Sequence, residues 1–123
     1  MLNQARLVAF IATSNPDRAR RFYGEQLGLK LVSDDPYALV FEANGTMIRV
    51  QKVERFTPQP FTALGWMVSN LEQVLAELRA KHIACEQFPG LEQDEHGIWS
   101  APSGARVAWV KDPDGNVLSV TEL

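Results

Sequence analysis

Few side chains in this sequence are suited to chemistry, and Arg49 is the most distinctive of them. It lies among the apolar residues Met47, Ile48 and Val50, in a segment that reads as a strand. A guanidinium can hold a carboxylate or phosphate through two hydrogen bonds, so Arg49 could act as an anion or carbonyl clamp. The other interpretation is a salt bridge to an acidic residue such as Glu42. The sequence leaves both interpretations open.

The hydroxyl and imidazole groups form no catalytic constellation. Ser119 has no neighbouring histidine to activate it, which favours a polar lining residue over a nucleophile. His82 follows a predicted helix, where a turn is expected, and His96 lies in the acidic segment 88–97. The acidic residues of that segment are most simply a solvated loop, with a weak cation site at His96 as the alternative. We therefore predict no catalytic residues.

Three tryptophans could stack on a planar ligand, although core packing is the more common role of a tryptophan. Alternation along the strand places Trp66 against the second predicted helix, in the core. Trp109 could face either way, and Trp99, beside a loop, could cover a ligand.

The first half of the chain predicts the order βαβββ. Apolar residues 7–13 predict a strand covered on both faces, followed by a helix that Asn15 caps and Gly28 ends. Three further strands are expected at 30–33, 37–42 and 46–53. Asn44–Gly45, between the last two, is a strong hairpin signal.

The second half repeats this order. A strand at 62–68 leads to a helix capped by Asn70, with Leu71, Val74, Leu75 and Leu78 as its apolar stripe. Strands are then expected at 82–87, 104–111 and 116–122, the last two joined by the turn Asp112–Asn116. The caps lie 55 residues apart, and the segments that begin at Gly45 and Gly115 share one apolar pattern. We interpret the chain as a duplicated module of residues 5–53 and 61–123, joined by a linker at 54–60.

Composition excludes several classes of protein. With 46% hydrophobic and 22% charged residues, the 123-residue chain reads as one globular domain and not as a disordered one. A net charge of −3 argues against a nucleic-acid partner, and no stretch is long and apolar enough for a membrane partner. Cys85 is the only cysteine, so no intrachain disulfide forms. The default location is cytoplasmic.

Two motifs, in this order, resemble those of the vicinal oxygen chelate superfamily, which includes glyoxalase I, extradiol dioxygenases and bleomycin-resistance proteins. They are Phe22–Tyr23 followed by Leu27–Gly28–Leu29, and the closing turn Asp112–Asn116. The resemblance covers nearly the whole chain. It implies an α+β fold in which two βαβββ modules form an open, curved mixed sheet that cups a ligand, in many members as a homodimer.

Metal-using members of this superfamily take ligands, usually His, Glu or Gln, from four strand positions. Carried over one at a time, those positions are Val8, Arg49, Ala63 and Ser119 in this sequence. None of the four is a good ligand for a divalent ion. We therefore expect no cofactor and no metal, which argues against metal-dependent lyase or dioxygenase activity.

The same positions define the lining of the expected cup, because residues two apart share one face of a strand. The predicted ligand-binding residues form a mainly apolar set with a few polar groups, as is typical of binding pockets: Val8, Phe10, Met47, Arg49, Gln51, Ala63, Met67, Trp109, Ser119 and Thr121.

These patterns favour a metal-independent, homodimeric small-molecule binding protein that holds a planar or anionic ligand. The alternative is a lyase, isomerase or dioxygenase-like enzyme that uses a displaced metal or polar residues alone. A third interpretation is a partner-regulating domain whose cup is filled by its own side chains. The sequence does not name the ligand.

Overall fold

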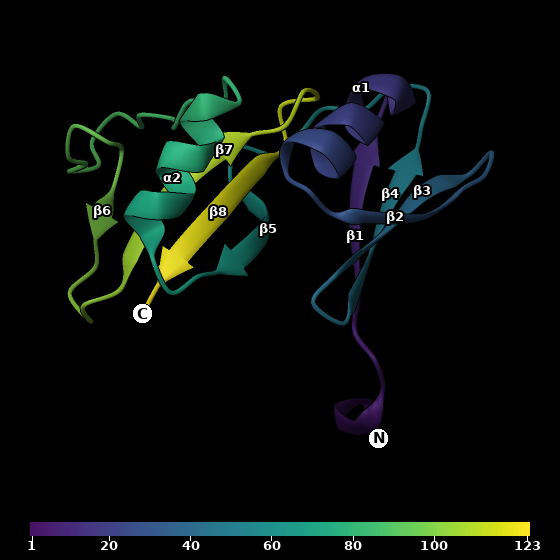
Figure 1. Ribbon diagram of the computed structural model, residues 1–123, viewed down its shortest axis with the longest axis horizontal. Coiled ribbons are helices and arrows are strands. Elements are labelled where there is room, and N and C mark those ends of the chain that lie inside the picture. Colours follow the sequence, from purple (N-terminus) through teal and green to yellow (C-terminus); the bar gives the residue numbers. More distant parts are fainter. The chain divides into compact units, whose positions relative to one another are not determined.

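Each half of the chain folds into a four-stranded mixed sheet with one helical segment, in a computed structural model that describes residues 1–123 (Figure 1). The halves are the compact units Met1–Pro58 and Gln59–Leu123, here called unit 1 and unit 2. The boundary falls within the predicted linker 54–60. The expected α+β fold with two βαβββ modules is confirmed. No helix is long and apolar enough to cross a membrane.

Unit 1 contains four strands in the order β1-β4-β3-β2, with β1 parallel to β4 and the other pairs antiparallel. A short arm with the 3₁₀ helix η1 (Leu2–Gln4) precedes them, and the helical segment consists of α1 and the π-helical η2. The remaining elements are β1 (Val8–Thr13), α1 (Pro16–Arg20), η2 (Arg21–Gln26), β2 (Lys30–Asp34), β3 (Ala38–Ala43) and β4 (Thr46–Lys52).

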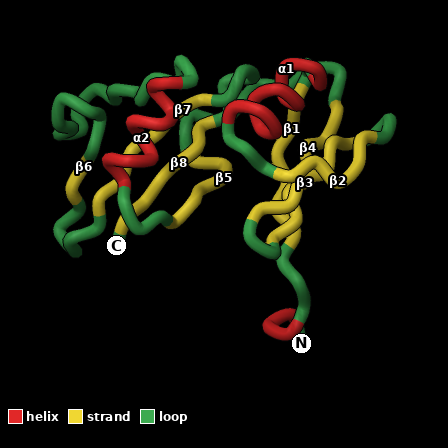
Figure 2. The backbone as a smooth tube through the Cα atoms, in the orientation of Figure 1, coloured by secondary structure: helices red, strands yellow, loops and turns green.

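Unit 2 repeats this topology in the order β5-β8-β7-β6, again with the first pair parallel and the others antiparallel. Figure 2 shows its helix lying along one side of the strands. The elements are β5 (Thr62–Met67), α2 (Leu71–Ala80), β6 (Trp99–Ser100), β7 (Arg106–Lys111) and β8 (Val117–Glu122).

The capping signals read from the sequence are confirmed. The Asn15 side chain accepts a hydrogen bond from the Arg18 N–H, and Asn70 accepts one from the Gln73 N–H. Gly28 has a φ of 78°, a conformation that ends the first helical segment at little cost only for glycine. Both helical segments therefore begin where the sequence predicts.

The helical segment of each unit covers one face of its sheet. In unit 1 the buried Tyr23 ring packs against the buried Phe41 ring, with the centroids 6.0 Å apart. In unit 2 the buried residues Leu71 and Leu75 of α2 face the strand side that carries the buried Leu118. The opposite side of each sheet, here called the open face, is not covered by a helix.

Two sequence predictions about strands are wrong. The segment 7–13 is not covered on both faces, because Leu7 is 75% exposed and Phe10 54%. The segment 82–87 forms no strand, and the two-residue β6 is the edge strand of unit 2. The Gln93 side chain holds this part of the chain as a loop: it accepts a hydrogen bond from the Phe88 N–H and donates to the carbonyls of Glu86 and Gly97.

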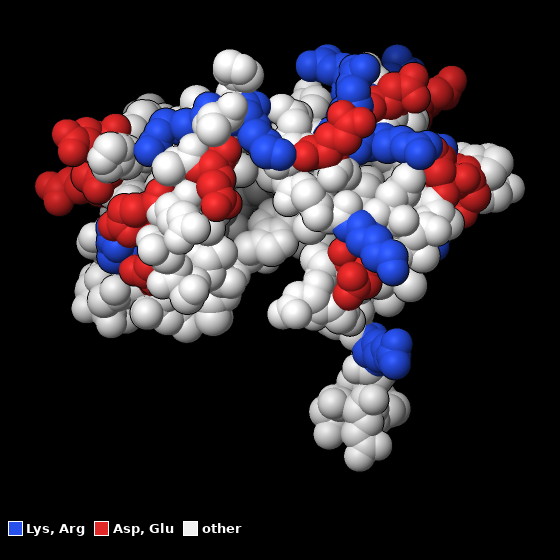
Figure 3. All heavy atoms as spheres, viewed as in Figure 1, with Lys and Arg blue, Asp and Glu red and all other residues white.

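Acidic and basic side chains lie next to one another on the visible face of each unit in Figure 3. In unit 1 Asp34 pairs with Arg20 at 2.8 Å and with Lys52 at 2.5 Å. In unit 2 Arg106 pairs with Glu72 and, at 3.1 Å, with Glu122. These six side chains are therefore used in structural pairs.

These pairs predict acid sensitivity. The hydrogen bond from Lys52 is the main cause that lowers the pKa of Asp34 below its usual 3.8, and the bond from Arg106 lowers the pKa of Glu72 below its usual 4.5. A lowered folded-state pKa contributes stability that is present above the unfolded pKa and is lost as the pH falls through the folded pKa. We expect the free energy of unfolding to be flat from pH 7 to about 5 and to fall below about 4. Urea titrations across this range should show that the free energy of unfolding of Asp34→Asn depends less on pH than that of wild type. The same pH dependence in both proteins would contradict the assignment.

Candidate functional site

The open face of unit 1 carries five of the predicted ligand-binding residues, and they come from two neighbouring strands. In the parallel pair β1–β4, Val8 lies beside Met47, Phe10 beside Arg49, and Ala12 beside Gln51. Val8, Phe10 and Met47 are 37%, 54% and 41% exposed, whereas Ile48 and Val50 of the other face are buried. This surface is thus apolar and solvent-accessible, with Arg49 near its middle.

Arg49 makes no ion pair in the chain. The expected alternative partner, Glu42, instead accepts a hydrogen bond from the Gly45 N–H at 2.5 Å, within the Asn44–Gly45 hairpin. Asp35 lies close enough for Arg49 to contribute to lowering its pKa, although hydrogen bonds from the Tyr37 and Ala38 N–H groups are the larger causes. The Arg49 guanidinium therefore keeps its hydrogen-bond donors available.

The open face of unit 2 carries four of the other five predicted residues: Met67, Trp109, Ser119 and Thr121. Gly65, Ser119 and Trp109 lie side by side across β5, β8 and β7, and Met67 and Thr121 lie side by side in the next row. Met67 is 70% exposed, whereas Trp109, Ser119 and Thr121 are half-buried. Ala63 is exposed but lies in a β-bulge of β5, where the register shifts between Thr62 and Leu64.

Trp109 belongs to an aromatic cluster, which we define as Phe88, Trp99 and Trp109. The Phe88 and Trp109 rings meet edge to face with centroids 5.6 Å apart, and the Trp99 and Trp109 rings are tilted at 6.3 Å. The Trp109 indole N–H donates to the Thr62 hydroxyl at 3.1 Å. Trp109 is thus fixed by three neighbours, and a planar ligand could stack on the cluster without reordering it.

Phe88 and Thr62 contact Trp109, and the sequence predicts neither contact. Phe88 reaches the open face through a loop whose path depends on Gln93, and no local pattern signals that contact. Thr62 reaches Trp109 because the bulge at Ala63 shifts the strand register. A bulge of this kind leaves no strong signal in the sequence. The sequence predicts Trp99 beside a loop, where it could cover a ligand, but does not predict its contact with the Trp109 ring.

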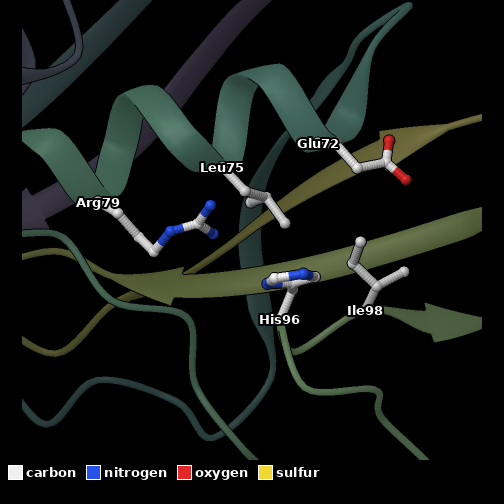
Figure 4. Close-up of a pocket in the computed structure, with 5 residues that line it drawn as sticks. All are labelled: Glu72, Leu75, Arg79, His96 and Ile98. Atoms are coloured by element: carbon white, nitrogen blue, oxygen red, sulfur yellow. The ribbon is translucent and has the colours of Figure 1, made fainter.

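Two cavities border the loop that precedes β6. One, of about 40 Å³, lies between α2 and the loop before β6. Figure 4 shows Glu72 and Arg79 at its two ends, with Leu75 and Ile98 between them and His96 on the loop side. It is much smaller than the roughly 300 Å³ that organic ligands need. The other, of about 320 Å³, is lined by Trp99 and by polar residues of the loop before it, among them Gln93 and Asp94, whose side chains hold the loop together.

The residues present do not fit a divalent metal ion. Val8 and Arg49 on unit 1, and Ala63 and Ser119 on unit 2, offer no imidazole, carboxylate or thiolate. No group of three or more His, Cys, Asp or Glu side chains is placed to hold a metal ion. His96 lies 3.5 Å from Glu95, and both side chains are largely exposed. Burial raises the pKa of the Cys85 thiol, which keeps it protonated and a poor ligand.

Comparisons with known proteins agree with the fold described above. Residues 4–120 match the profile of the Glyoxalase/Bleomycin resistance protein/Dioxygenase superfamily. No curated protein matches the sequence significantly.

Three solved structures illustrate the structural likeness. A lactoylglutathione lyase from Agrobacterium tumefaciens is 16% identical with a TM-score of 0.76, covering 97% of this chain and 93% of its own. A member of the same superfamily from Sphaerobacter thermophilus DSM 20745 is 21% identical with a TM-score of 0.75, covering 100% of both chains. TioX from Micromonospora sp. ML1 is 18% identical with a TM-score of 0.70, covering 96% and 98%. At these identities the likeness concerns the fold alone.

Proposed function

Because the chain belongs to the Glyoxalase/Bleomycin resistance protein/Dioxygenase superfamily, we propose that it is a metal-independent small-molecule binding protein. It would hold a planar or anionic ligand on the open faces of its sheets. The observation that carries the proposal is Arg49, a guanidinium without an ion pair beside the exposed Phe10 and Met47. An apolar surface with a few placed polar groups suits binding, and it supplies no group that would make or break a bond.

The open face of unit 1 suits an anionic ligand, and the open face of unit 2 suits a planar ligand. Arg49 offers a planar fork of donors to a carboxylate or phosphate. The aromatic cluster of unit 2 offers ring faces and edges to a planar group. The homodimer and the cytoplasmic location expected from the sequence are part of the proposal, and gel filtration and cell fractionation test them.

A thermal-shift screen against 2-oxoacids, aromatic antibiotics and thiol conjugates tests the binding function. A ligand at a hundredfold excess over its Kd should raise the free energy of unfolding by about 2.7 kcal/mol. Metal analysis of the purified protein tests metal independence. About one Ni, Zn, Mn or Fe per chain, lost when an open-face residue is replaced, would overturn that part of the proposal.

Arg49→Ala should abolish the thermal shift given by any anionic ligand, because the variant loses the donors that pair with the anion. The shift given by an uncharged planar ligand should remain. Arg18→Ala is the matched control, since Arg18 lies on α1, which covers the other face of the sheet in unit 1. An anion-dependent shift of the same size in Arg49→Ala would remove Arg49 from the site.

A further inference from the structure

We infer that Gly65 and Ser119 form a matched pair on the open face of unit 2, which selects uncharged planar ligands that carry a hydrogen-bonding group at the ring edge. The inference rests on the proposed function and deepens it by naming a ligand class. The ring would lie against Trp109, and the polar edge would meet the Ser119 hydroxyl. The pair consists of side-by-side residues, Gly65 on β5 and Ser119 on β8.

Gly65 is needed for space and not for backbone conformation. Its φ is not positive, unlike that of six other glycines, so the backbone would accept any residue. A Cβ atom at position 65 would nevertheless lie 2.4 Å from the Ser119 Oγ and 3.5 Å from the Ser119 carbonyl oxygen. A distance of 2.4 Å is well below van der Waals contact. The absent side chain therefore makes room for the Ser119 hydroxyl where it stands.

The duplicated module shows how unit 1 differs at the same place. Phe10 and Arg49 are side by side in β1 and β4, as Gly65 and Ser119 are in β5 and β8. The two rows are offset by 55 residues in the first strand and by 70 in the last, the separations of the sequence repeat. Unit 1 thus presents a ring and a guanidinium where unit 2 presents bare backbone and a hydroxyl. The row in unit 2 suits a flat, uncharged group.

Within the row Gly65, Ser119 and Trp109, the Ser119 hydroxyl is the side-chain group that is free to form a hydrogen bond with a ligand. No hydrogen bond of its hydroxyl is seen within the chain, whereas the indole N–H of the neighbouring Trp109 is taken by Thr62. The nearest cation along β7 on this face, Lys111, lies 3.7 Å from the Glu86 carboxylate. Side chains directly opposite each other on antiparallel strands have Cβ atoms about 5 Å apart, so a ring stacked on Trp109 can bring its edge to the Ser119 hydroxyl.

Binding of 2-naphthol and 2-methylnaphthalene tests the inference, because the two probes differ only in the group at the ring edge. Their dissociation constants can be measured by quenching of tryptophan fluorescence. A neutral hydrogen bond contributes about 0.5–1.5 kcal/mol, so wild-type protein should bind 2-naphthol about 2- to 12-fold more tightly. Ser119→Ala should remove this preference, so that the ratio of the two dissociation constants falls to about 1. A preference that persists in Ser119→Ala would overturn the inference.

Gly65→Ala tests the pairing itself. The added methyl group should displace the Ser119 side chain and weaken the binding of both probes. The double variant Gly65→Ala/Ser119→Ala should bind both probes as Ser119→Ala does, because the clash is gone. Thermal unfolding of each variant separates these effects from loss of the fold. Wild-type affinities in Gly65→Ala, or no recovery in a folded double variant, would overturn the pairing.

The outcomes distinguish this inference from the proposed function. If wild-type protein binds both probes equally, the inference fails while binding of planar ligands stands. If neither probe binds wild-type protein, the inference fails, and so does the proposed binding of planar ligands on this face.

Discussion

Replacing Asp112 with alanine is expected to lower the free energy of unfolding by about 2–4 kcal/mol, because several buried donors lose their acceptor together. The Asp112 carboxylate accepts hydrogen bonds from the backbone N–H groups of Asp114 and Asn116 at 3.0 and 2.9 Å. It also accepts one from the Asn116 side-chain amide at 2.8 Å. Asp112 and Asn116 are only 5% and 6% exposed, so water cannot readily replace these bonds. Chemical denaturation followed by circular dichroism measures the loss.

Asp35→Ala is the matched control for this prediction. Asp35 also accepts two backbone N–H groups, from Tyr37 and Ala38, but those bonds lie in an exposed or partly buried turn. Water can satisfy the Tyr37 N–H in the variant, so its loss should be smaller. The free energy of unfolding of Asp112→Asn should lie between those of wild type and Asp112→Ala, because one amide group would then face the amide of Asn116. If Asp112→Ala costs no more than Asp35→Ala, burial does not explain the importance of the closing turn.

The features predicted correctly from the sequence are those that depend on a few adjacent residues. Asn15 and Asn70 cap helices because an amide oxygen can reach an N–H group three residues later. Asn44 and Gly45 have φ values of 46° and 87°, the left-handed pair that a two-residue hairpin requires. Both signals are local, so no knowledge of the rest of the fold was needed to read them.

The errors lie where one side chain organises a distant stretch of backbone. The segment 82–87 was predicted as a strand from its composition, but Gln93 holds the following loop through three hydrogen bonds. The only backbone hydrogen bond from this segment to β7 runs from the Glu86 N–H to the Trp109 carbonyl oxygen, at 2.8 Å. A single bond of this kind forms no ladder. Strand propensity was outweighed by a side-chain contact that no periodicity reveals.

The sequence predicts which residues of the candidate site share one face of a strand, but not which side chains contact one another. Strand parity correctly grouped Val8 with Phe10, and Arg49 with Met47 and Gln51, on one face. The sequence could not choose between an ion pair and a free guanidinium for Arg49. In the fold, Glu42 accepts a hydrogen bond from the Gly45 N–H and forms no ion pair with Arg49. This arrangement is visible only in the fold.

Trp109→Ala is expected to weaken the binding of a planar ligand about 5- to 150-fold, the equivalent of the roughly 1–3 kcal/mol that stacking on one aromatic side chain contributes. The substitution removes the ring that contacts both Phe88 and Trp99, so the aromatic cluster also loses both of its ring contacts. Fluorescence is unsuitable as the readout when a tryptophan is removed, and isothermal titration calorimetry with 2-naphthol replaces it.

Two further substitutions separate the ring from its orientation. Trp109→Phe retains an aromatic face but loses the N–H that donates to Thr62 at 3.1 Å, so its affinity should lie between those of wild type and Trp109→Ala. Thr62→Val keeps the indole and removes only its acceptor, and its loss should be smaller than that of Trp109→Phe. Trp66→Phe is the control, because Trp66 lies beside Val120 on the helix-covered face. If Trp66→Phe weakens binding as much as Trp109→Phe does, the ligand is not on the open face of unit 2. If Thr62→Val alone matches Trp109→Ala, the orientation of the indole outweighs its stacking area.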